Sequence, residues 1–537
     1  MLEQYSDTNL NEELFPDGKV CRIMFDNVQL KWRILFRDRF QFEQLYEAFS
    51  VPNPAAFFTS IYGYNTNKNF YLVNNFGFFD VGFIFEIFRY LKIKFGSLDV
   101  VAMSRPAKAF MRTFLLPLKG FSDSHDKIAF SVSNISSKYQ LRDYQTAAIK
   151  SIIFDGFGRG LLELPTGSGK SFIIANFIYT MLQQIDSTYK TLIFVPNKQL
   201  VEQFYKDLID YGFNKEDLGK LTGGMKKKEE NPNAKIIIGN RQFLFSNKNK
   251  LPKIDILVCD EVHSIAPNSN SFDFVEKIDC KIKIGCSGTL PKDKYSKFKL
   301  IGLFSRIFHT EDIVKLQNEG YLSKLNITLL NIIDQKIEAD RNILFHTRSK
   351  IHYTEESDIA FNDAYNAEID YIIHNYEKLY SPILEHARSL KGNTLILFDR
   401  IEFGKNMYEY AKEINLRPAE KIFYIDGQTP VDIREQVRQG FESSTDNVLF
   451  AQVSIFSQGI NIKNLTNLVM FASSKSASRT IQSIGRTLRK HESKDKATVI
   501  DCVFNFKYSQ KHFKERLKLY KEFYNKSKPD KIIDISV

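Results

Sequence analysis

Cysteine is scarce in this chain of 537 residues, and long hydrophobic runs are missing. The five cysteines are an odd number without a Cys-x-x-Cys pair, which predicts neither a disulfide framework nor a zinc site and fits a reducing compartment. The most apolar stretch, 76–91, is interrupted by Asp80, Glu86 and Arg89, so it is unsuited to crossing a bilayer about 30 Å thick. The acidic segment 1–17 has no signal-peptide core. We therefore expect a soluble cytoplasmic protein without a membrane segment.

Acidic residues are outnumbered by basic ones. The chain has 63 Asp and Glu against 74 Lys and Arg, a formal net charge of +11. This excess favours a polyanionic partner such as nucleic acid. The content of 43% hydrophobic and 26% charged residues is that of a globular protein, and the length predicts roughly three domains.

Short apolar runs alternate with longer helical patterns from about residue 140 onward, as in α/β domains with parallel sheets. The runs typical of strands buried on both faces are 191–195, 236–238, 254–259 and 282–286 in the first half and 393–399, 448–451, 468–471 and 498–500 in the second. The second set repeats the order of the first. We predict an α/β fold of two similar lobes after a smaller domain, with domains at 1–130, 131–325 and 326–537.

The first 130 residues have a different pattern. Apolar side chains alternate with polar or basic ones from 28 to 36, which predicts a strand with Trp32 in the core and a basic outer face. Apolar residues at helical spacing predict a helix over 81–91. We predict a small α+β domain whose basic strand face either contacts nucleic acid or is simply solvated.

Polar and basic segments complete the pattern. The segment 334–357 is predicted to be a linker, and 362–390 to form one or two helices. The basic tail, 507–531, which includes Arg516, predicts a helix face that is either solvated or in contact with phosphates. The lysine run 226–228 predicts a loop with the same two alternatives.

A glycine-rich segment reads Pro-Thr-Gly-Ser-Gly-Lys-Ser, between the apolar run 161–164 and a helical pattern over 172–181. Such a turn cradles phosphates, because glycines let backbone N–H groups approach and the helix N-terminus carries partial positive charge. Lys170 can reach the β- and γ-phosphates, and the Ser171 hydroxyl can bind Mg²⁺. The residues predicted to bind nucleotide here are Pro165, Thr166, Gly167, Ser168, Gly169, Lys170 and Ser171. The strict pattern has glycine where this chain has Leu164.

Two carboxylates, Asp260 and Glu261, follow the buried run 254–259. Nucleotide hydrolysis needs such a pair, one to order the Mg²⁺ that bridges the β- and γ-oxygens and one to position or deprotonate the attacking water. We assign Asp260 to the metal and Glu261 to the water.

Two arginines, Arg486 and Arg489, lie more than 300 residues after Lys170, in the lobe without a phosphate loop. They are three positions apart, so on a helix they would share one face. Guanidinium groups can stabilise the charge on a γ-phosphoryl group. Supplied by the other lobe, they would make hydrolysis depend on lobe closure, as in a motor.

These segments, in this order, resemble the motifs of superfamily 2 helicases over roughly residues 136–505. The resemblance implies two RecA-like lobes in tandem and an adenine-reading segment with Arg142 and Gln145. The catalytic residues that it implies are Lys170, Asp260, Glu261, Gln482, Arg486 and Arg489. It also implies that Ser287 and Thr289 link hydrolysis to unwinding, and that His263 either relays between motifs or is only a satisfied polar group.

The same resemblance implies nucleotide contacts at Gly459 and Asn461. The nucleic-acid contacts that it implies are Pro196, Thr222, Gly223 and Gln242. The family usually has Asp at the position of Asn461, and commonly Thr-x-Gln where this chain has Asn240-Arg241-Gln242.

Within the superfamily, the chain is similar to phage enzymes of recombination and repair. This implies an ATP- and Mg²⁺-dependent DNA helicase, monomeric and in the host cytoplasm, that remodels forks, Holliday junctions, displacement loops or RNA–DNA hybrids. The first domain would bind branched DNA. An RNA helicase or a duplex-DNA translocase of a restriction system is the alternative, and a non-catalytic scaffold is a third reading.

Overall fold

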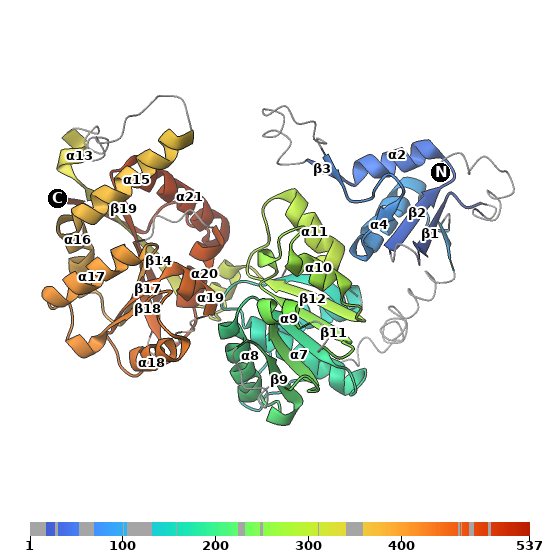
Figure 1. Cartoon of the computed structure of the whole chain (residues 1–537), viewed down its shortest axis with the longest axis horizontal. Coiled ribbons are helices and arrows are strands. Elements are labelled where there is room, and N and C mark those ends of the chain that lie inside the picture. The colour runs from blue at the N-terminus through green and yellow to red at the C-terminus, as the bar shows by residue number, and fades with distance from the viewer. Residues whose placement is uncertain are drawn as a thin grey trace. The chain divides into compact units, whose positions relative to one another are not determined.

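The computed structural model describes residues 15, 18–26, 31–52, 69–99, 101–104, 131–156, 158–223, 231–247, 251–309, 311–339, 358–459, 462, 464–471, 477–491, 494 and 496–537. Two compact units are present (Figure 1). The first consists of Met1–Leu164 and Lys170–Thr310, and the second of Pro165–Gly169 and Glu311–Val537. No helix of the described part is long and apolar enough to cross a membrane.

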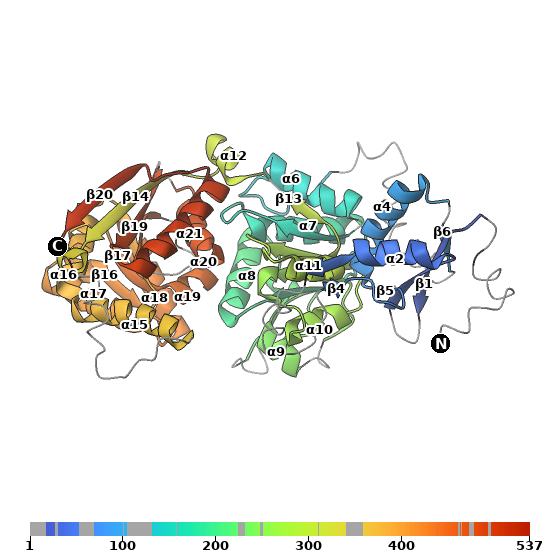
Figure 2. The ribbon, with the colours of Figure 1, turned by 90° about the horizontal axis from the view of Figure 1, so that it is seen from above.

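The first lobe is built on a seven-stranded sheet whose neighbouring strands are all parallel. In Figure 2 this lobe is coloured from teal to yellow-green, with α7, α8 and β13 among its labelled elements. Its strands in spatial order are β13 (Ile307–His309), β7 (Arg159–Glu163), β12 (Ile282–Ser287), β11 (Ile256–Asp260), β8 (Thr191–Val195), β10 (Ile236–Asn240) and β9 (Leu218–Leu221). The four apolar runs predicted as strands in this half of the chain are confirmed.

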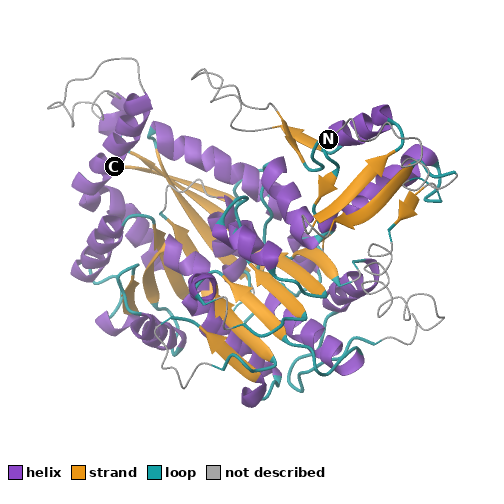
Figure 3. Cartoon of the chain, turned by 45° about the vertical axis from the view of Figure 1, so that its right-hand side comes forward, coloured by secondary structure: helices purple, strands orange, loops and turns teal. Residues whose placement is uncertain are grey.

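Helices cover both faces of this sheet (Figure 3). Ile193 and Val195 of β8 face one core, and Leu192 and Phe194 face the other, because successive side chains of a strand point to opposite sides. The helices of the first core are α6 (Asp143–Lys150), α7 (Lys170–Gln184) and α8 (Lys198–Tyr211). Those of the second are α9 (Arg241–Ser246), α10 (Asn270–Lys277) and α11 (Lys294–Phe304).

The second lobe repeats this architecture with another parallel sheet of seven strands. In spatial order they are β16 (Ile422–Ile425), β17 (Val448–Gln452), β15 (Asn393–Phe398), β18 (Leu465–Met470), β19 (Lys496–Phe504), β14 (Lys324–Ile333) and β20 (Lys531–Ser536). The helices are α12 (Ile313–Asn318), α13 (Gln335–Ala339), α15 (Asp358–His374), α16 (Tyr376–Ser389), α17 (Ile401–Glu413), α18 (Val431–Glu442), α19 (Val453–Gly459), α20 (Ala477–Thr487) and α21 (Lys507–Tyr524). The prediction of two similar α/β lobes is confirmed.

The N-terminal region forms the predicted small α+β domain. Its main sheet has the strands β5 (Phe78–Phe79), β2 (Lys31–Phe36), β1 (Cys21–Asp26) and β6 (Val101–Met103), and a second sheet pairs β3 (Ser50–Pro52) with β4 (Asn69–Tyr71). The helices are α2 (Arg39–Ala48) and α4 (Ile84–Phe95). Trp32 is 3% exposed in the core, as predicted.

Basic side chains of β2 and of the residue that follows it make contacts within the N-terminal domain. Arg33 donates to the carbonyl oxygen of Phe76 at 2.8 Å and lies over the ring of Phe78. Arg37 donates to the carbonyl oxygen of Phe15 at 2.6 Å. Both guanidinium groups therefore help to hold the domain together.

The N-terminal domain packs directly against α11 of the first lobe. A Cβ atom on Gly82 would lie 2.0 Å from the carbonyl oxygen of Ile301, so only glycine allows this approach. The rings of Phe70 and Tyr295 stack with their centroids 4.0 Å apart. The contact joins two backbones and two aromatic rings.

Several sequence predictions need correction. The predicted linker 334–357 begins with helix α13, and Asp334 is fully buried, where it accepts hydrogen bonds from Tyr371 and Lys378. In the basic tail, Arg516 is 1% exposed and paired with Asp501 at 2.7 Å. Arg516 is therefore neither solvated nor available to phosphates, the two alternatives predicted for this tail. The residues 340–357 and 226–228 lie outside the described part.

All five cysteines are free and buried. Cys286 lies in the core under α7, and Cys259 in the core under α10. Burial raises the pKa of these two thiols, so both are packing residues.

Candidate functional site

The order of the strands in the first lobe divides its functional segments into two groups. The phosphate loop follows β7, Asp260 ends β11 and Ser287 ends β12, and these three strands are neighbours. The segments predicted to contact nucleic acid follow β8, β10 and β9, which make up the other half of the sheet. Carboxyl ends of parallel strands meet at one edge of a sheet, which is where ligands bind.

The phosphate loop has the backbone that its glycines allow. Gly167 and Gly169 have φ angles of 92° and 82°, in the left-handed region that disfavours residues with a Cβ atom. The backbone N–H of Leu164 donates to the carbonyl oxygen of Ser287 at 2.9 Å, which ties the start of the loop to β12. Helix α7 begins at Lys170, so its N-terminus opens from the loop.

Lys170 lies between the two predicted catalytic carboxylates. Its Nζ is 3.0 Å from Oδ1 of Asp260 and 2.8 Å from Oε1 of Glu261. Although burial lowers the pKa of Lys170, the two carboxylates raise it by more, so the amine is charged. Burial and the adjacent Glu261 raise the pKa of Asp260, whereas Lys170 and His263 hold the pKa of Glu261 well below its usual value against the effect of burial.

Glu261 has a strained backbone conformation. Its φ and ψ angles are 51° and 50°, a left-handed conformation that is uncommon for residues other than glycine and costs of order 1–3 kcal/mol. The conformation follows directly after β11 and precedes a short 3₁₀ turn, Val262–Ser264. Strain of this kind persists where the surrounding fold holds the residue in place.

A hydrogen-bonded chain joins these carboxylates to Ser287 and Thr289. Nδ1 of His263 lies 3.2 Å from Oε2 of Glu261 and 2.9 Å from Oγ of Ser287. Ser287 donates its hydroxyl proton to the carbonyl oxygen of Thr289 at 2.6 Å, so it accepts from His263, and Nδ1 carries the proton. The three residues predicted to link hydrolysis to unwinding therefore lie in one chain of contacts.

The donor set fits Mg²⁺. Asp260 offers carboxylate oxygens at 4% exposure, and Ser171 offers a hydroxyl, both hard ligands of the kind that Mg²⁺ prefers. The Ser171 hydroxyl lies 2.9 Å from the hydroxyl of Tyr211. The described residues contain no group of three or more His, Cys, Asp or Glu placed for a metal.

The predicted adenine-reading segment forms the start of α6. Gln145 is 3% exposed, and its side-chain oxygen accepts from the backbone N–H of Arg142 at 3.0 Å. Arg142 donates to the hydroxyl of Tyr144 at 3.0 Å. Both side chains thus help to begin the helix, a role that the sequence analysis did not predict.

In the second lobe, Arg486 lies on helix α20, whereas Arg489 lies after the end of this helix. Arg486 lies in the last turn of α20, is 9% exposed, and lies 5.8 Å from the ring centroid of Phe456 on α19. The prediction that Arg489 shares its helix face is wrong, because α20 ends at Thr487 and Arg489 pairs with Leu322 in an antiparallel bridge.

The other predicted nucleotide contacts of this lobe are Gln482, Gly459 and Asn461. Gln482 lies on α20, although its side chain is outside the described part. Gly459 ends α19, and Asn461 lies outside the described residues.

The predicted nucleic-acid contacts follow three adjacent strands. Pro196 follows β8, Thr222 and Gly223 follow β9, and Gln242 is exposed on α9 after β10. The Thr222 hydroxyl and the side-chain oxygen of Asn240 are buried and have no hydrogen-bond partner among the residues described. Thr222 is only 4% exposed, so its backbone and Gly223 are better placed to meet a ligand than its side chain.

Two contacts were not predicted from the sequence. Tyr211 meets Ser171 across 40 residues of chain. Glu163, the last residue of β7, accepts from the backbone N–H of Leu290 at 3.3 Å and lies 2.9 Å from His309. No local pattern marks such pairs, since they depend on the order of strands in the folded sheet.

Comparisons with known proteins agree with this arrangement. Residues 138–292 match the family model "Type III restriction enzyme, res subunit", and residues 375–491 match "Helicase conserved C-terminal domain". The chain is 27% identical over 362 residues to the ATP-dependent DNA helicase uvsW of Enterobacteria phage T4, covering 66% of this chain and 67% of that protein.

Two further proteins are similar. The DNA 3'-5' translocase XPB2 of Sulfurisphaera tokodaii is 23% identical over 402 residues, covering 69% of this chain and 82% of that protein. The structure of Saccharomyces cerevisiae Dbp5 bound to RNA and ADP BeF3 matches with a TM-score of 0.51 and 14% identity, covering 79% of this chain and 93% of Dbp5. The structural likeness concerns the fold.

Proposed function

We propose, from the premise that the chain belongs to the superfamily 2 helicases, that it is an ATP-dependent DNA helicase or translocase that remodels branched DNA. The observation that carries the proposal is the contact chain from Lys170 through Glu261 and His263 to Ser287, at the carboxyl edge of the first lobe. This contact chain joins Lys170, the predicted phosphate-binding amine, to His263 and Ser287. These two residues would link ATP hydrolysis to unwinding.

ATP would lie on the phosphate loop, with the backbone N–H groups of 165–171 and Lys170 on its phosphates and Arg142 and Gln145 near the adenine. Mg²⁺, held by Asp260 and Ser171, would neutralise the β- and γ-oxygens. Glu261, ionised at neutral pH, would orient the attacking water and accept its proton. His263 holds the Glu261 carboxylate in place.

The second lobe would complete the site. Arg486 and Arg489 would stabilise charge on the γ-phosphoryl group, with Gln482, Gly459 and Asn461 beside the nucleotide. Because these residues belong to the lobe without a phosphate loop, hydrolysis would require the lobes to close. Cycles of closing and opening would move the protein along a strand.

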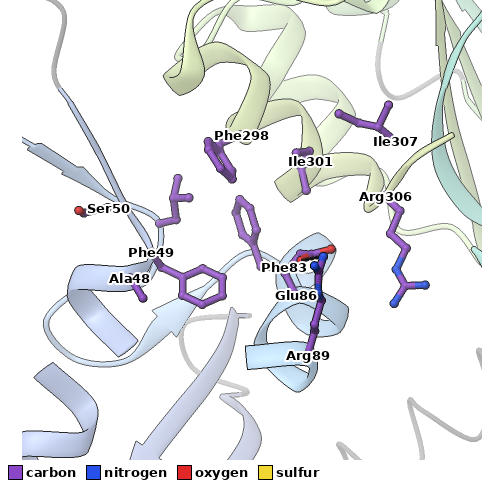
Figure 4. Close-up of a pocket in the computed structure, with 11 residues that line it drawn as sticks. Ala48, Phe49, Ser50, Phe83, Glu86, Arg89, Phe298, Ile301, Arg306 and Ile307 are labelled. Atoms are coloured by element: carbon purple, nitrogen blue, oxygen red, sulfur yellow. Dashed lines mark ion pairs between the residues drawn. The ribbon is translucent and has the colours of Figure 1, made fainter. Parts of the chain in front are cut away.

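Nucleic acid would follow the other half of the sheet edge, at Pro196, Thr222, Gly223 and Gln242. The N-terminal domain would add an accessory contact at a crevice of about 690 Å³ against α11. Phe49, Phe83 and Phe298 line this crevice, and Arg89 and Arg306 lie along its side (Figure 4). Aromatic rings beside guanidinium groups suit a nucleotide with its base and phosphate.

DNA is favoured over RNA by the similarity to the phage T4 DNA helicase. We propose that the activity serves recombination, repair or replication. We expect a monomer. A duplex translocase of a restriction system is the second candidate, because the family model of residues 138–292 is named for such an enzyme. An RNA helicase is the third.

One experiment separates these candidates. ATP hydrolysis and unwinding would be measured on forks, four-way junctions, displacement loops, RNA–DNA hybrids, blunt duplex DNA and RNA of matched length. We expect branched DNA to give the highest activity at equal nucleotide concentration. Equal activity on blunt duplex DNA would support the restriction-type translocase, and stimulation by RNA alone would support the RNA helicase.

A further inference from the structure

Lys494 is a buried cation in the second lobe that lies outside the motifs described above. Its side chain is 7% exposed, and its Nζ donates to the carbonyl oxygens of Leu465 and Thr487, each at 2.6 Å. Lysine is almost never buried unless its charge is balanced. Among the residues that the structure describes, the partners of Lys494 are these two carbonyl oxygens and no carboxylate.

The two carbonyl groups belong to functional segments. Thr487 is the last residue of α20, directly after Arg486 and two positions before Arg489. Leu465 is the first residue of β18, shortly after the predicted nucleotide contacts Gly459 and Asn461. One ammonium group therefore ties the end of the arginine helix to the strand that follows the other nucleotide-binding segment.

The charge of Lys494 suits this place. The last carbonyl groups of a helix lack partners within the helix and carry partial negative charge, so a cation there is favourable. Burial, and then the nearby Arg489, lower the pKa of Lys494 to about 8.

The segment after α20 is also held by the residues just before β14. The backbone N–H of Ser323 donates to the carbonyl oxygen of Leu488 at 2.8 Å, and Leu322 pairs with Arg489. The residues 487–489 are therefore fixed between Lys494 and the start of β14. This explains why Arg489 leaves the helix and yet has a defined position.

We propose that Lys494 is a positioning residue that sets the direction of Arg486 and Arg489 toward ATP. This inference rests on the proposed function, in which these arginines complete the hydrolytic site. Lys494 touches no reacting atom and acts only through the end of α20.

The test is a double-mutant cycle on DNA-stimulated ATP hydrolysis. Lys494→Met removes the charge at similar length and should lower kcat at least 10-fold, while the affinity for a fluorescent ATP analogue changes less than 2-fold. In an Arg486→Ala background, Lys494→Met should have less than a 2-fold further effect. Lys496→Met, an exposed lysine on β19, is the matched control and should behave like the parent.

Two results would overturn the proposal: an unchanged kcat in Lys494→Met, or an equal loss of kcat with and without Arg486. A parent-like kcat in Arg486→Ala itself would instead refute the proposed function. If Lys494→Met does not fold, Lys494→Arg provides the test, because guanidinium does not titrate. The kcat of the parent should fall above about pH 8, where Lys494 loses its proton, and Arg489 is the charged group that acts on Lys494. The kcat of Lys494→Arg should not fall in this range. Identical pH profiles of the two proteins would contradict the proposal.

Discussion

Lys170 shows how the chemistry of one residue follows from its neighbours. It is the first residue of α7, and its amine contacts both Asp260 and Glu261. The local patterns were enough to select these three residues, because each lies where a buried strand or glycine turn ends. Sequence spacing did not reveal that Tyr211 would contact Ser171, since that pair depends on how α7 and α8 pack.

The first prediction concerns the division of roles between Lys170 and Glu261. Glu261→Gln should bind an ATP analogue within about 3-fold of the parent and lose at least 100-fold in kcat, because the amide cannot accept a proton. Lys170→Ala should lose both binding and hydrolysis. Analogue fluorescence and phosphate release measure the two quantities.

Glu276→Gln, on the exposed side of α10, is the control for the loss of a carboxylate. If Glu261→Gln had the same kcat as the parent, Glu261 would have no role in hydrolysis.

The second prediction concerns Glu368 on α15. Its carboxylate accepts from the backbone N–H groups of Tyr508 and Ser509 at the start of α21, and burial raises its pKa to about 7. The pKa is raised in the folded state, so its contribution to stability is present below about pH 4.5 and is lost as the pH rises through 7.

Relative to Glu368→Gln, the parent should therefore lose about 3 kcal/mol of unfolding free energy between pH 4.5 and pH 8. Urea unfolding at both pH values measures this difference. A parent and variant with the same pH dependence would show that folding does not raise the pKa of Glu368.

At the scale of elements, α11 joins the motor to the N-terminal domain. It begins just after Ser287 and Thr289, and its residues contact Gly82 and Phe70. Apolar runs were enough to predict nine of the fourteen strands of the two sheets, and β9, β13, β14, β16 and β20 were missed. They did not predict this contact, because it depends on two backbones approaching closely, nor the end of α20 before Arg489, because pairing with Leu322 competes with the helix.

The third prediction is that Gly82→Ala weakens this junction. The new Cβ atom would lie 2.0 Å from the carbonyl oxygen of Ile301 and 2.4 Å from that of Gly302, so the backbones must separate. We expect a loss of about 1–3 kcal/mol, as for overpacking of a core. Limited proteolysis should release the N-terminal domain faster than in the parent.

Lys294→Ala, at an exposed position of α11, should leave the proteolysis rate unchanged. Equal rates for Gly82→Ala and the parent would mean that the junction contributes nothing to holding the domain.

At the scale of the whole molecule, two similar lobes divide the proposed hydrolytic site. The two parallel sheets were predictable from repeated apolar runs, since strands buried on both faces have a clear pattern. The spatial order of the strands within each sheet was not predicted. The predicted boundary at residue 325 lies inside β14, an inner strand of the second sheet that pairs with β19 and β20. What the sequence could not provide is the contact network of Glu163, His263 and Lys494.

The division of the hydrolytic site between two lobes is tested most directly by a protein that carries both Arg486→Ala and Arg489→Ala. Its DNA-stimulated ATP hydrolysis and its affinity for ATP would be measured in parallel. The affinity of this variant for ATP should stay within about 3-fold of the parent, and its kcat should be lower by about 10³-fold, because arginines of this kind act on the transition state. Hydrolysis at the parent rate in the presence of DNA would contradict a site divided between two lobes.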